Sequence, residues 1–358
     1  MSMKQYLFII LAITIYSCSS NKEDSGESKK EKESKISYLA IKGETQGTFY
    51  NITYKDTLNR NLKESIDSIL LDFDNSLSTY NSASLITEFN SYKEVQLDSF
   101  FYNVHLLSKE IYQKTDGSFN PSLFSLVSAW GFGLQDAENV TQELIDSLLP
   151  NCNYDSVYLK KKETVFPDQI NWQLTTNKNT EIEYNAIAQG YSVDVIGQYL
   201  KKLGINNYMI EIGGEVLCNG ISPKGNLWKI GIDKPIKTET LDQRELQTII
   251  TVNNEAVATS GNYRKFYEKD GVKYSHTINP KTGRPVEHSL LSVTVITDGC
   301  GKADAYATAF MVMGVKGTKS FLMENKDLNI EVYLIYDENG VNKTYSSKGL
   351  ESKMNDLS

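Results

Sequence analysis

The chain has 358 residues, of which 40% are hydrophobic and 23% are charged, and its formal net charge is −8. This composition describes a globular chain that can bury a sizeable core, and it excludes an overall disordered, collagen-like or coiled-coil protein. The 45 acidic residues outnumber the 37 basic ones. No basic stripe interleaved with aromatic residues is present, so nucleic acid is excluded as an expected partner.

Residues 1–18 have the features of a bacterial lipoprotein signal peptide. An n-region with the single basic residue Lys4 precedes an apolar run over residues 6–16, which is too short to span a bilayer as a helix of roughly 20 residues. The segment 15–18, Ile-Tyr-Ser-Cys, resembles a lipobox, although Tyr16 is bulkier than the usual residue. We therefore predict acylation of Cys18, with palmitate among the expected chains. The alternative is a cleaved signal peptide with an incidental cysteine.

Residues 19–37 form a predicted flexible tether between this anchor and a folded domain over residues 38–358. The segment holds five lysines, five acidic residues and six serines, with one aliphatic residue and no aromatic one, so it cannot bury enough surface to fold. The predicted location is extracytoplasmic, anchored by lipid to a bacterial membrane. The acidic pair after Lys22 resembles a surface-export signal, but the inner membrane, the outer membrane and the cell surface stay open.

The part of the chain from residue 38 onward mixes helix-period and strand-period patterns, which predicts an α+β fold. Apolar residues repeat at helical spacing over residues 62–77, and Asp98 is placed to cap a second helix. Turn signals at residues 270–271 and 339–340 predict two hairpins. Strand-like runs occur at residues 49–54, 208–212, 228–232, 246–252, 291–296 and 330–336. The cysteines after Cys18 fall in separate segments, without disulfide-framework or zinc-ligand spacing, so they are predicted to be unpaired.

Two segments carry small or polar residues that are typical of a ligand site. A helix is predicted to open at residues 185–191, Asn-Ala-Ile-Ala-Gln-Gly-Tyr, where a ligand or a second backbone can approach closely; tight helix packing explains the same spacing. Residues 274–285 read as a strand that leads into a turn and carries His276, which alone does not indicate a general base. No glycine cluster completes a dinucleotide-binding or P-loop motif.

A third segment, residues 301–310, reads as a helix that follows a strand and a glycine-rich turn. It puts Asp304 and Thr308 at i and i+4, on one helical face. A carboxylate and a hydroxyl in this arrangement suit Mg²⁺, which takes oxygen ligands and retains waters or phosphates. The alternative is a capping aspartate and a threonine that bonds to its own helix.

These three segments occur in this order, with Gly213-Gly214-Glu215 and residues 258–261, Ala-Thr-Ser-Gly, between them. Together they resemble the ApbE family, the FAD:protein FMN transferases, over residues 39–336. The resemblance implies an α+β fold with antiparallel-rich sheets of the ApbE-like type and FAD in a cleft between two subdomains. Further motifs that carry it are Gly47-Thr48, residues 77–80 (Leu-Ser-Thr-Tyr), Phe89-Asn90, residues 117–121 (Gly-Ser-Phe-Asn-Pro) and residues 130–132 (Trp-Gly-Phe).

The resemblance implies an enzyme that cleaves the FAD pyrophosphate with Mg²⁺ and attaches FMN by a phosphoester bond to a threonine of a target protein, releasing AMP. FAD is then the substrate, Mg²⁺ the cofactor, and an acceptor protein, such as a subunit of a membrane redox complex, the partner. Some members of the family hydrolyse FAD to FMN and AMP instead. Two non-enzymatic hypotheses also stand: a flavin-binding lipoprotein without turnover, and a structural surface lipoprotein whose motifs are packing features.

The resemblance also assigns site residues. The metal ligands would be the backbone oxygen of Ala186, Asp304 and Thr308, with Ala307 beside them, and His276 would be the base near the acceptor hydroxyl. The family usually has Met at the position of Gln46, Asp at that of Glu183, and Lys or Glu at that of Gln189, differences that affect FAD binding more than the metal. The expected FAD contacts are Gln46, Tyr80, Ser118, Phe119, Asn120, Glu183, Gln189, Gly213, Gly214, Ser260, Gly261 and Ile278.

Overall fold

The computed structural model describes residues 37–132, 140–162, 171–236, 245–262, 266–269 and 272–355, all within the unit Ile36–Ser358. The predicted signal peptide, Cys18 and the predicted tether up to residue 36 lie outside the described residues. Among the described residues, no helix combines the length and the apolar composition that a membrane span requires.

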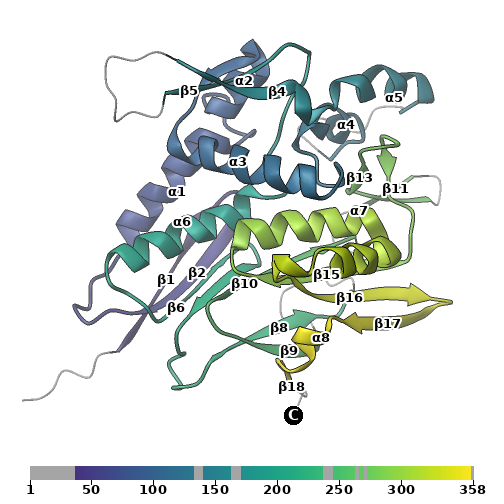
Figure 1. The fold of residues 1–358 in the computed structure, drawn as a ribbon. Helices are drawn as coiled ribbons and strands as arrows, with labels where there is room; N and C mark the ends of the chain where they lie inside the picture. Colours follow the sequence, from purple (N-terminus) through teal and green to yellow (C-terminus); the bar gives the residue numbers. More distant parts are fainter. Residues whose placement is uncertain are drawn as a thin grey trace, which may run out of the picture. The chain divides into compact units, whose positions relative to one another are not determined.

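An eight-stranded sheet is the largest sheet among the described residues, and every neighbouring pair of its strands is antiparallel (Figure 1). Antiparallel neighbours can be joined by short turns, as happens at three places in this sheet. In spatial order the strands are β1 (Tyr38–Thr45), β2 (Thr48–Lys55), β6 (Tyr208–Ile212), β7 (Glu215–Asn219), β10 (Glu255–Gly261), β15 (Leu290–Thr297), β16 (Glu331–Glu338) and β17 (Val341–Ser346).

Both faces of this sheet are buried, because successive side chains of a strand point to opposite faces. In β16, Val332 and Leu334 join one hydrophobic cluster, whereas Tyr333 and Ile335 join another. Each large apolar side chain buried in this way contributes roughly 1.5–3 kcal/mol to folding. The first cluster is completed by the helices α1 (Lys63–Leu77), α3 (Ser99–Lys114), α6 (Ala188–Lys202) and α7 (Cys300–Glu324).

Helices α6 and α7 contact the large sheet directly, and α3 packs against α1 and α7 above them (Figure 1). The opposite face of the sheet is covered by a three-stranded sheet, whose Trp228, Ile250 and Val252 pack in the second cluster. The elements on that side are β8 (Trp228–Asp233), β9 (Leu246–Val252), β18 (Met354–Asn355) and α8 (Lys348–Glu351).

Smaller elements surround this framework. A third cluster, with Trp130 and Ile278 among its members, packs α4 (Phe124–Ala129) and α5 (Gln142–Leu148) against β13 (Ile278–Asn279). The remaining helices and strands are α2 (Leu85–Tyr92), β3 (Glu94–Gln96), β4 (Val157–Lys161), β5 (Trp172–Thr176), β11 (Phe266–Lys269), β12 (Val272–Ser275) and β14 (Arg284–Pro285). Short 3₁₀ turns lie at Pro121–Leu123, Leu149–Asn151, Tyr154–Ser156 and Lys326–Leu328.

The predicted α+β class with antiparallel sheets is confirmed, and so are several local predictions. Asp98 caps α3, because its Oδ1 accepts a hydrogen bond of 2.8 Å from the Phe101 N–H. Asn339 and Gly340 both have positive φ in the turn between β16 and β17, as hairpin turns require. The pair at 270–271 lies outside the described residues, although the flanking β11 and β12 are antiparallel. The cysteines Cys152, Cys218 and Cys300 are unpaired and buried.

The predicted start of the helix at residue 185 is wrong, because α6 begins at Ala188. The Tyr184 carbonyl accepts hydrogen bonds from the N–H groups of both Ile187 and Ala188, which closes a turn before the helix. Ile187 itself has φ −153° and ψ −30°, outside the helical region. Residues 185–187 therefore form the approach to α6 and not its first turn.

Candidate functional site

Helix α7 carries Asp304 and Thr308 one helical turn apart, as predicted. The helix begins immediately after β15 and a short turn, so its first turns lie over the middle of the large sheet, against β10. Asp304 is only 8% exposed. The Thr308 Oγ1 lies 3.4 Å from the Ser260 Oγ, near the end of β10, so the sheet and the helix present two hydroxyls side by side.

The start of α6 meets Asp304 directly. The Gly190 N–H donates a hydrogen bond of 3.1 Å to the Asp304 Oδ2. In a continuous helix this N–H would donate to the Ala186 carbonyl four residues earlier, so the bond to Asp304 leaves that carbonyl outside the α6 hydrogen-bond ladder. A Cβ at Gly190 would lie 2.4 Å from the Cys300 carbonyl oxygen. Only glycine lets the two helices approach this closely.

The turn between β6 and β7 lies against the same end of α6. Gly213 and Gly214 have φ of 63° and 114°, values that L side chains disfavour. The Gly213 N–H donates to the Phe49 carbonyl in β2 at 3.1 Å. The Gln189 Nε2 donates to the Ile212 carbonyl at 3.4 Å and occupies the space where a Gly213 side chain would begin. Gln189 and the two glycines, three of the expected FAD contacts, therefore lie together.

Gln46 lies in the turn between β1 and β2, with φ of 51°. Its backbone N–H bonds to the Asp74 carboxyl, whose pKa is raised by burial and lowered in part by this bond. The Gln46 Nε2 is buried, and no described residue accepts a hydrogen bond from it. A buried donor without an acceptor costs about 1–3 kcal/mol, so this amide is suited to donate to a bound molecule.

Burial raises the pKa of two carboxyl groups in this region to about 7. For Asp304 the hydrogen bond from Gly190 offsets part of the effect, and for Glu183 a hydrogen bond from the Asn185 side chain does the same. A buried carboxylate without a cation is costly, and a nearby positive charge lowers such a pKa again. Both groups therefore have an electrostatic preference for a positively charged neighbour.

The site offers oxygen atoms of mixed origin and a single central carboxylate. Within the described ranges, no group of three or more His, Cys, Asp or Glu side chains is placed to hold a metal ion. Mg²⁺ does not require such a group, because it is commonly held by one or two carboxylates together with waters and substrate phosphates. The Ala307 side chain is fully buried, so this residue would contribute backbone atoms only.

Three expected FAD contacts on the α4 side have structural roles of their own. Phe119 is 2% exposed in the main core. The Asn120 Oδ1 accepts from the Ser122 N–H at 2.9 Å, and its Nδ2 donates to the Cys152 carbonyl at 3.0 Å. Ile278 packs in the third cluster. Ser118, the residue before Phe119, is half-buried. Because the side chains of Phe119 and Ile278 are buried, any contact of these two residues with a ligand would use backbone atoms.

The remaining predicted residues differ in exposure. Tyr80 is 66% exposed after α1, whereas Gly261 is half-buried at the end of β10. The half-buried His276 follows β12, and its ring packs edge-on against Phe132 with centroids 6.3 Å apart. Direct contacts thus join Gln189 to Gly213 and Ser260 to Thr308. Asp304 contacts Gly190, the residue after Gln189, and His276 lies on the segment leading to β13.

Sequence reasoning missed Asp194, which lies at the same helix crossing. Its Oδ1 accepts from the Cys300 N–H at 2.8 Å and its Oδ2 accepts from the Gly301 N–H at 2.9 Å. Two signals were present in the sequence: Asp194 is four residues after Gly190 and so shares its helical face, and Gly299 has no side chain with which to cap α7. The capping group comes from another helix.

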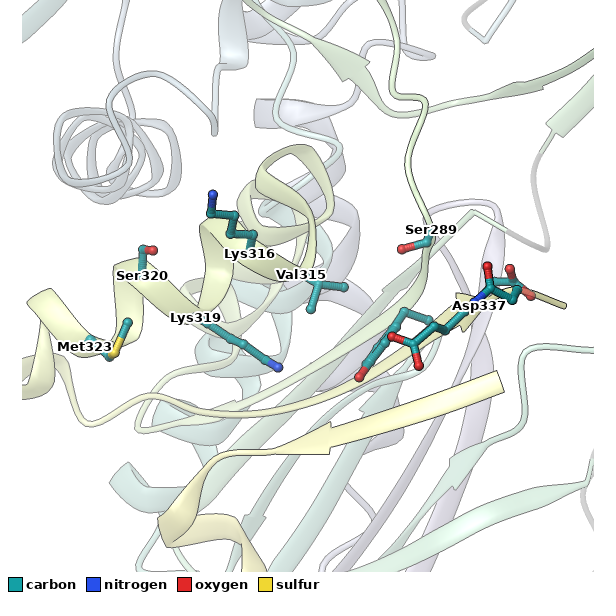
Figure 2. A pocket seen from close by; sticks show the side chains of 10 residues that line it. Ser289, Val315, Lys316, Lys319, Ser320, Met323 and Asp337 are labelled. Carbon is teal, nitrogen blue, oxygen red and sulfur yellow. The ribbon is translucent and has the colours of Figure 1, made fainter. Parts of the chain in front are cut away.

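A separate open cavity of ≈ 800 Å³ lies beyond the break of α7 at Gly314. Figure 2 shows Lys316, Lys319 and Met323 on the second half of α7, across from Asp337 on β16. The Lys319 Nζ also lies 4.2 Å from the ring centroid of Tyr345. None of the residues that line this cavity is an expected FAD or metal contact, so it is distinct from the site around Asp304.

Comparisons with known proteins agree with this geometry. Residues 46–334 match the model of the ApbE family. The chain is 32% identical over 323 residues to the FAD:protein FMN transferase of Vibrio cholerae, covering 87% of this chain and 91% of that protein. It is 30% identical over 321 residues to the Escherichia coli protein of the same name, covering 87% of this chain and 88% of that protein.

Solved structures show the same fold. The flavin transferase ApbE from Vibrio cholerae superimposes with a TM-score of 0.76 at 32% identity, covering 88% of this chain and 99% of that one. The apo form of the Pseudomonas stutzeri flavinyl transferase ApbE gives a TM-score of 0.76 at 29% identity, covering 88% and 96%. From the ordered motifs, the fold and these matches, the chain belongs to the ApbE family.

Proposed function

We propose that this protein is an FAD:protein FMN transferase that uses Mg²⁺ and attaches FMN to a threonine of an acceptor protein. The observation that carries the proposal is the contact between Gly190 and Asp304. It brings a buried carboxylate, a backbone carbonyl outside the helical ladder and the Thr308 hydroxyl to one helix crossing, in a member of a family whose named relatives transfer FMN.

The residues present fit a magnesium ion. Asp304 would supply the negative charge, and the Ala186 carbonyl and the Thr308 hydroxyl would supply neutral oxygens. Burial raises the Asp304 pKa, and a cation would reverse this shift. When bound here, Mg²⁺ would neutralise the charge that develops on the pyrophosphate oxygens of FAD.

The protein side chains would then direct a single displacement. The acceptor threonine oxygen forms a bond to the FMN phosphorus, the bond from that phosphorus to the bridging oxygen breaks, and AMP leaves with this oxygen. The threonine proton goes to His276, the base in this proposal. General-base assistance typically contributes about 10²–10⁴-fold. Gln46, Gln189 and the β6–β7 glycines would hold the dinucleotide.

The protein is proposed to act outside the cytoplasm, held to a membrane through lipid on Cys18. A tether of nineteen residues in the flexible regime has an end-to-end distance of about 24 Å. This reach would let the catalytic domain approach exposed parts of acceptor proteins at the membrane, such as subunits of redox complexes.

The test is to incubate the Cys18→Ala chain with FAD, Mg²⁺ and a threonine-containing acceptor domain. AMP is measured by chromatography, and flavin on the acceptor by in-gel fluorescence. Transfer predicts equal amounts of both. AMP without flavinylated acceptor would instead identify an FAD pyrophosphatase, and FAD binding without AMP a non-catalytic flavin-binding protein.

A matched pair of variants tests the site itself. Asp304→Asn should lower AMP release by at least 100-fold, because the amide cannot supply the charge that holds the metal, while it keeps the shape of the side chain. Asp298→Asn removes an exposed carboxylate just before the same helix, where it pairs with Lys302, and should leave AMP release within twofold of wild type. Equal activities of the two variants would contradict the assignment of Asp304.

A further inference from the structure

Helices α6 and α7 cap each other at their crossing. Asp304, in the second turn of α7, accepts from the Gly190 N–H in the first turn of α6. In return, Asp194, in the second turn of α6, accepts from the N–H groups of Cys300 and Gly301 in the first turn of α7. Each helix thus provides a carboxylate that accepts from the N-terminus of the other, from one N–H group of α6 and from two of α7.

The local sequence explains why the caps come from the partner helix. Neither Ile187, before α6, nor Gly299, before α7, makes a side-chain capping bond, although the first N–H groups of a helix have no partner within it. The close approach of the two helices lets a carboxylate of each helix take the place of the missing cap on the other. A Cβ at Gly190 would lie 2.4 Å from the Cys300 carbonyl oxygen, and a Cβ at Gly301 would lie 3.0 Å from the Tyr191 Cβ.

The two caps are coupled through the geometry of one helix. Asp304 follows Cys300 by four residues, so both lie on the same face of α7, and a shift of the α7 N-terminus relative to α6 moves the Asp304 carboxylate with it. The Asp194 bonds are the side-chain bonds that fix this N-terminus on α6 at the crossing, at 2.8 and 2.9 Å. Among the described residues, no hydrogen bond joins Asp194 to Asp304. Asp194 therefore influences the position of Asp304 through the backbone of α7.

We propose that Asp194 is a positioning residue for the metal-binding oxygens of this enzyme: by capping α7 from α6, it sets the distance between Asp304 and the Ala186 segment. This inference rests on the proposed function, because it assumes that Asp304 binds the metal. It predicts that loss of the Asp194 carboxylate lowers the affinity for the metal even in protein that remains folded at the assay temperature. The site residues themselves remain unchanged in such a variant.

The experiment compares wild type, Asp194→Ala, Asp194→Asn and Asp298→Asn, each on the Cys18→Ala background. Binding of Mn²⁺, a spectroscopic probe for a Mg²⁺ site, is measured by electron paramagnetic resonance, and AMP release is measured as a function of Mg²⁺ concentration. Melting temperatures are recorded so that all assays are run at least 15 °C below the lowest of them. Asp298→Asn is the matched control, because Asp298 precedes α7 but is exposed and pairs with Lys302.

We expect Asp194→Ala to weaken Mn²⁺ binding about tenfold and to raise the half-saturating Mg²⁺ concentration by a similar factor, with most of kcat recovered at saturating Mg²⁺. Asn has nearly the same shape as Asp and keeps one oxygen that can accept a hydrogen bond, so Asp194→Asn should change both quantities only about threefold. This variant keeps the test informative if Asp194→Ala does not fold. Asp298→Asn should match wild type in both readouts.

Two different outcomes would overturn the inference, and they differ in what else they overturn. A lowered melting temperature with wild-type Mn²⁺ affinity and Mg²⁺ dependence in both Asp194 variants would make the residue merely structural and leave the proposed function intact. A wild-type protein that neither binds Mn²⁺ nor releases AMP would overturn the proposed function together with the inference.

Discussion

At the scale of single residues, burial keeps one histidine of α3 neutral over most of the acidic pH range. His105 is 3% exposed in α3, and its Nδ1 lies 2.8 Å from the Tyr154 hydroxyl and 3.3 Å from that of Tyr184. Burial, with a smaller effect of Lys109, lowers the His105 pKa to about 4. Tyr184 also provides the carbonyl that closes the turn before α6, so this neutral cluster supports the segment that carries Ala186.

The His105 pKa leads to a stability prediction. The unfolded chain takes up a proton at His105 below pH 6.5, whereas the folded protein does so only near pH 4. The free energy of unfolding should therefore fall as the pH drops from about 6.5 to 4, by up to about 3 kcal/mol from this residue. Urea unfolding of wild type and His105→Gln at several pH values checks this. Equal slopes of stability against pH for the two proteins would rule out a neutral His105.

His276 leads to a kinetic prediction. If it accepts the proton of the acceptor threonine, His276→Ala should slow FMN transfer by 10²-fold or more, yet slow FAD hydrolysis much less, since water can lose its proton to solvent. The deciding quantity is the ratio of the two rates in one variant. Equal losses together with a lower melting temperature would assign His276 to the fold, and two unchanged rates would remove it from the mechanism.

At the scale of elements, the crossing of α6 and α7 is the feature on which the site depends. Both helices rest on the large sheet, with α7 against β10 and β15 and α6 against β6 and β7. The β6–β7 turn and the end of β10 therefore reach the two helices from the same sheet. Glycines at the crossing set how close the helices come.

A graded glycine series tests this crossing. A Cβ would lie 2.4 Å from a backbone oxygen at Gly190, 3.0 Å from the Tyr191 Cβ at Gly301, and 3.6 Å from the Asp194 Oδ2 at Gly299. Gly190→Ala should cost about 3 kcal/mol or more and abolish AMP release, Gly301→Ala should cost less, and Gly299→Ala should cost about 1 kcal/mol or less. Chemical unfolding measures the stability of each variant, and the AMP assay measures its activity. A Gly190→Ala protein with the stability and activity of wild type would contradict the predicted order of the three variants.

At the scale of the whole molecule, the protein is expected to combine an anchor, a tether and a catalytic domain that function separately. The described residues contain no helix fit to span a membrane. The attachment proposed above is through lipid on Cys18, which lies outside the described residues. Acyl chains supply about 0.8 kcal/mol of membrane affinity per buried CH₂. In the proposed arrangement, stable attachment would depend on that one side chain.

The corresponding prediction concerns localisation. Cys18→Ala should move the protein from the membrane fraction to the soluble extracytoplasmic fraction after lysis without detergent, and its rate of AMP release should stay within twofold of wild type. Immunoblots of the fractions and the AMP assay measure both. A Cys18→Ala protein that stays in the membrane fraction would contradict lipid anchoring.

Local sequence rules determined much of this protein. The cap at Asp98, the turn at Asn339 and Gly340, and the helix that carries Asp304 and Thr308 all follow from contacts within a few residues, and the structure shows each of them. The ordered motifs were sufficient to indicate the ApbE family, which the family match confirms. The turn signal at residues 339–340 likewise predicted a hairpin, because a two-residue turn joins neighbouring antiparallel strands, and β16 and β17 pair in this way.

Tertiary structure alone decided what surrounds Asp304. Gly190 and Asp304 are 114 residues apart in the chain, and Asp194 and Cys300 are 106 apart, so no periodicity or spacing links them. The late start of α6, the burial that raises the Asp304 pKa and the capping of α7 by Asp194 all follow from how closely two helices pack on one sheet. Such packing depends on the shapes of distant side chains, and a local pattern contains no record of it.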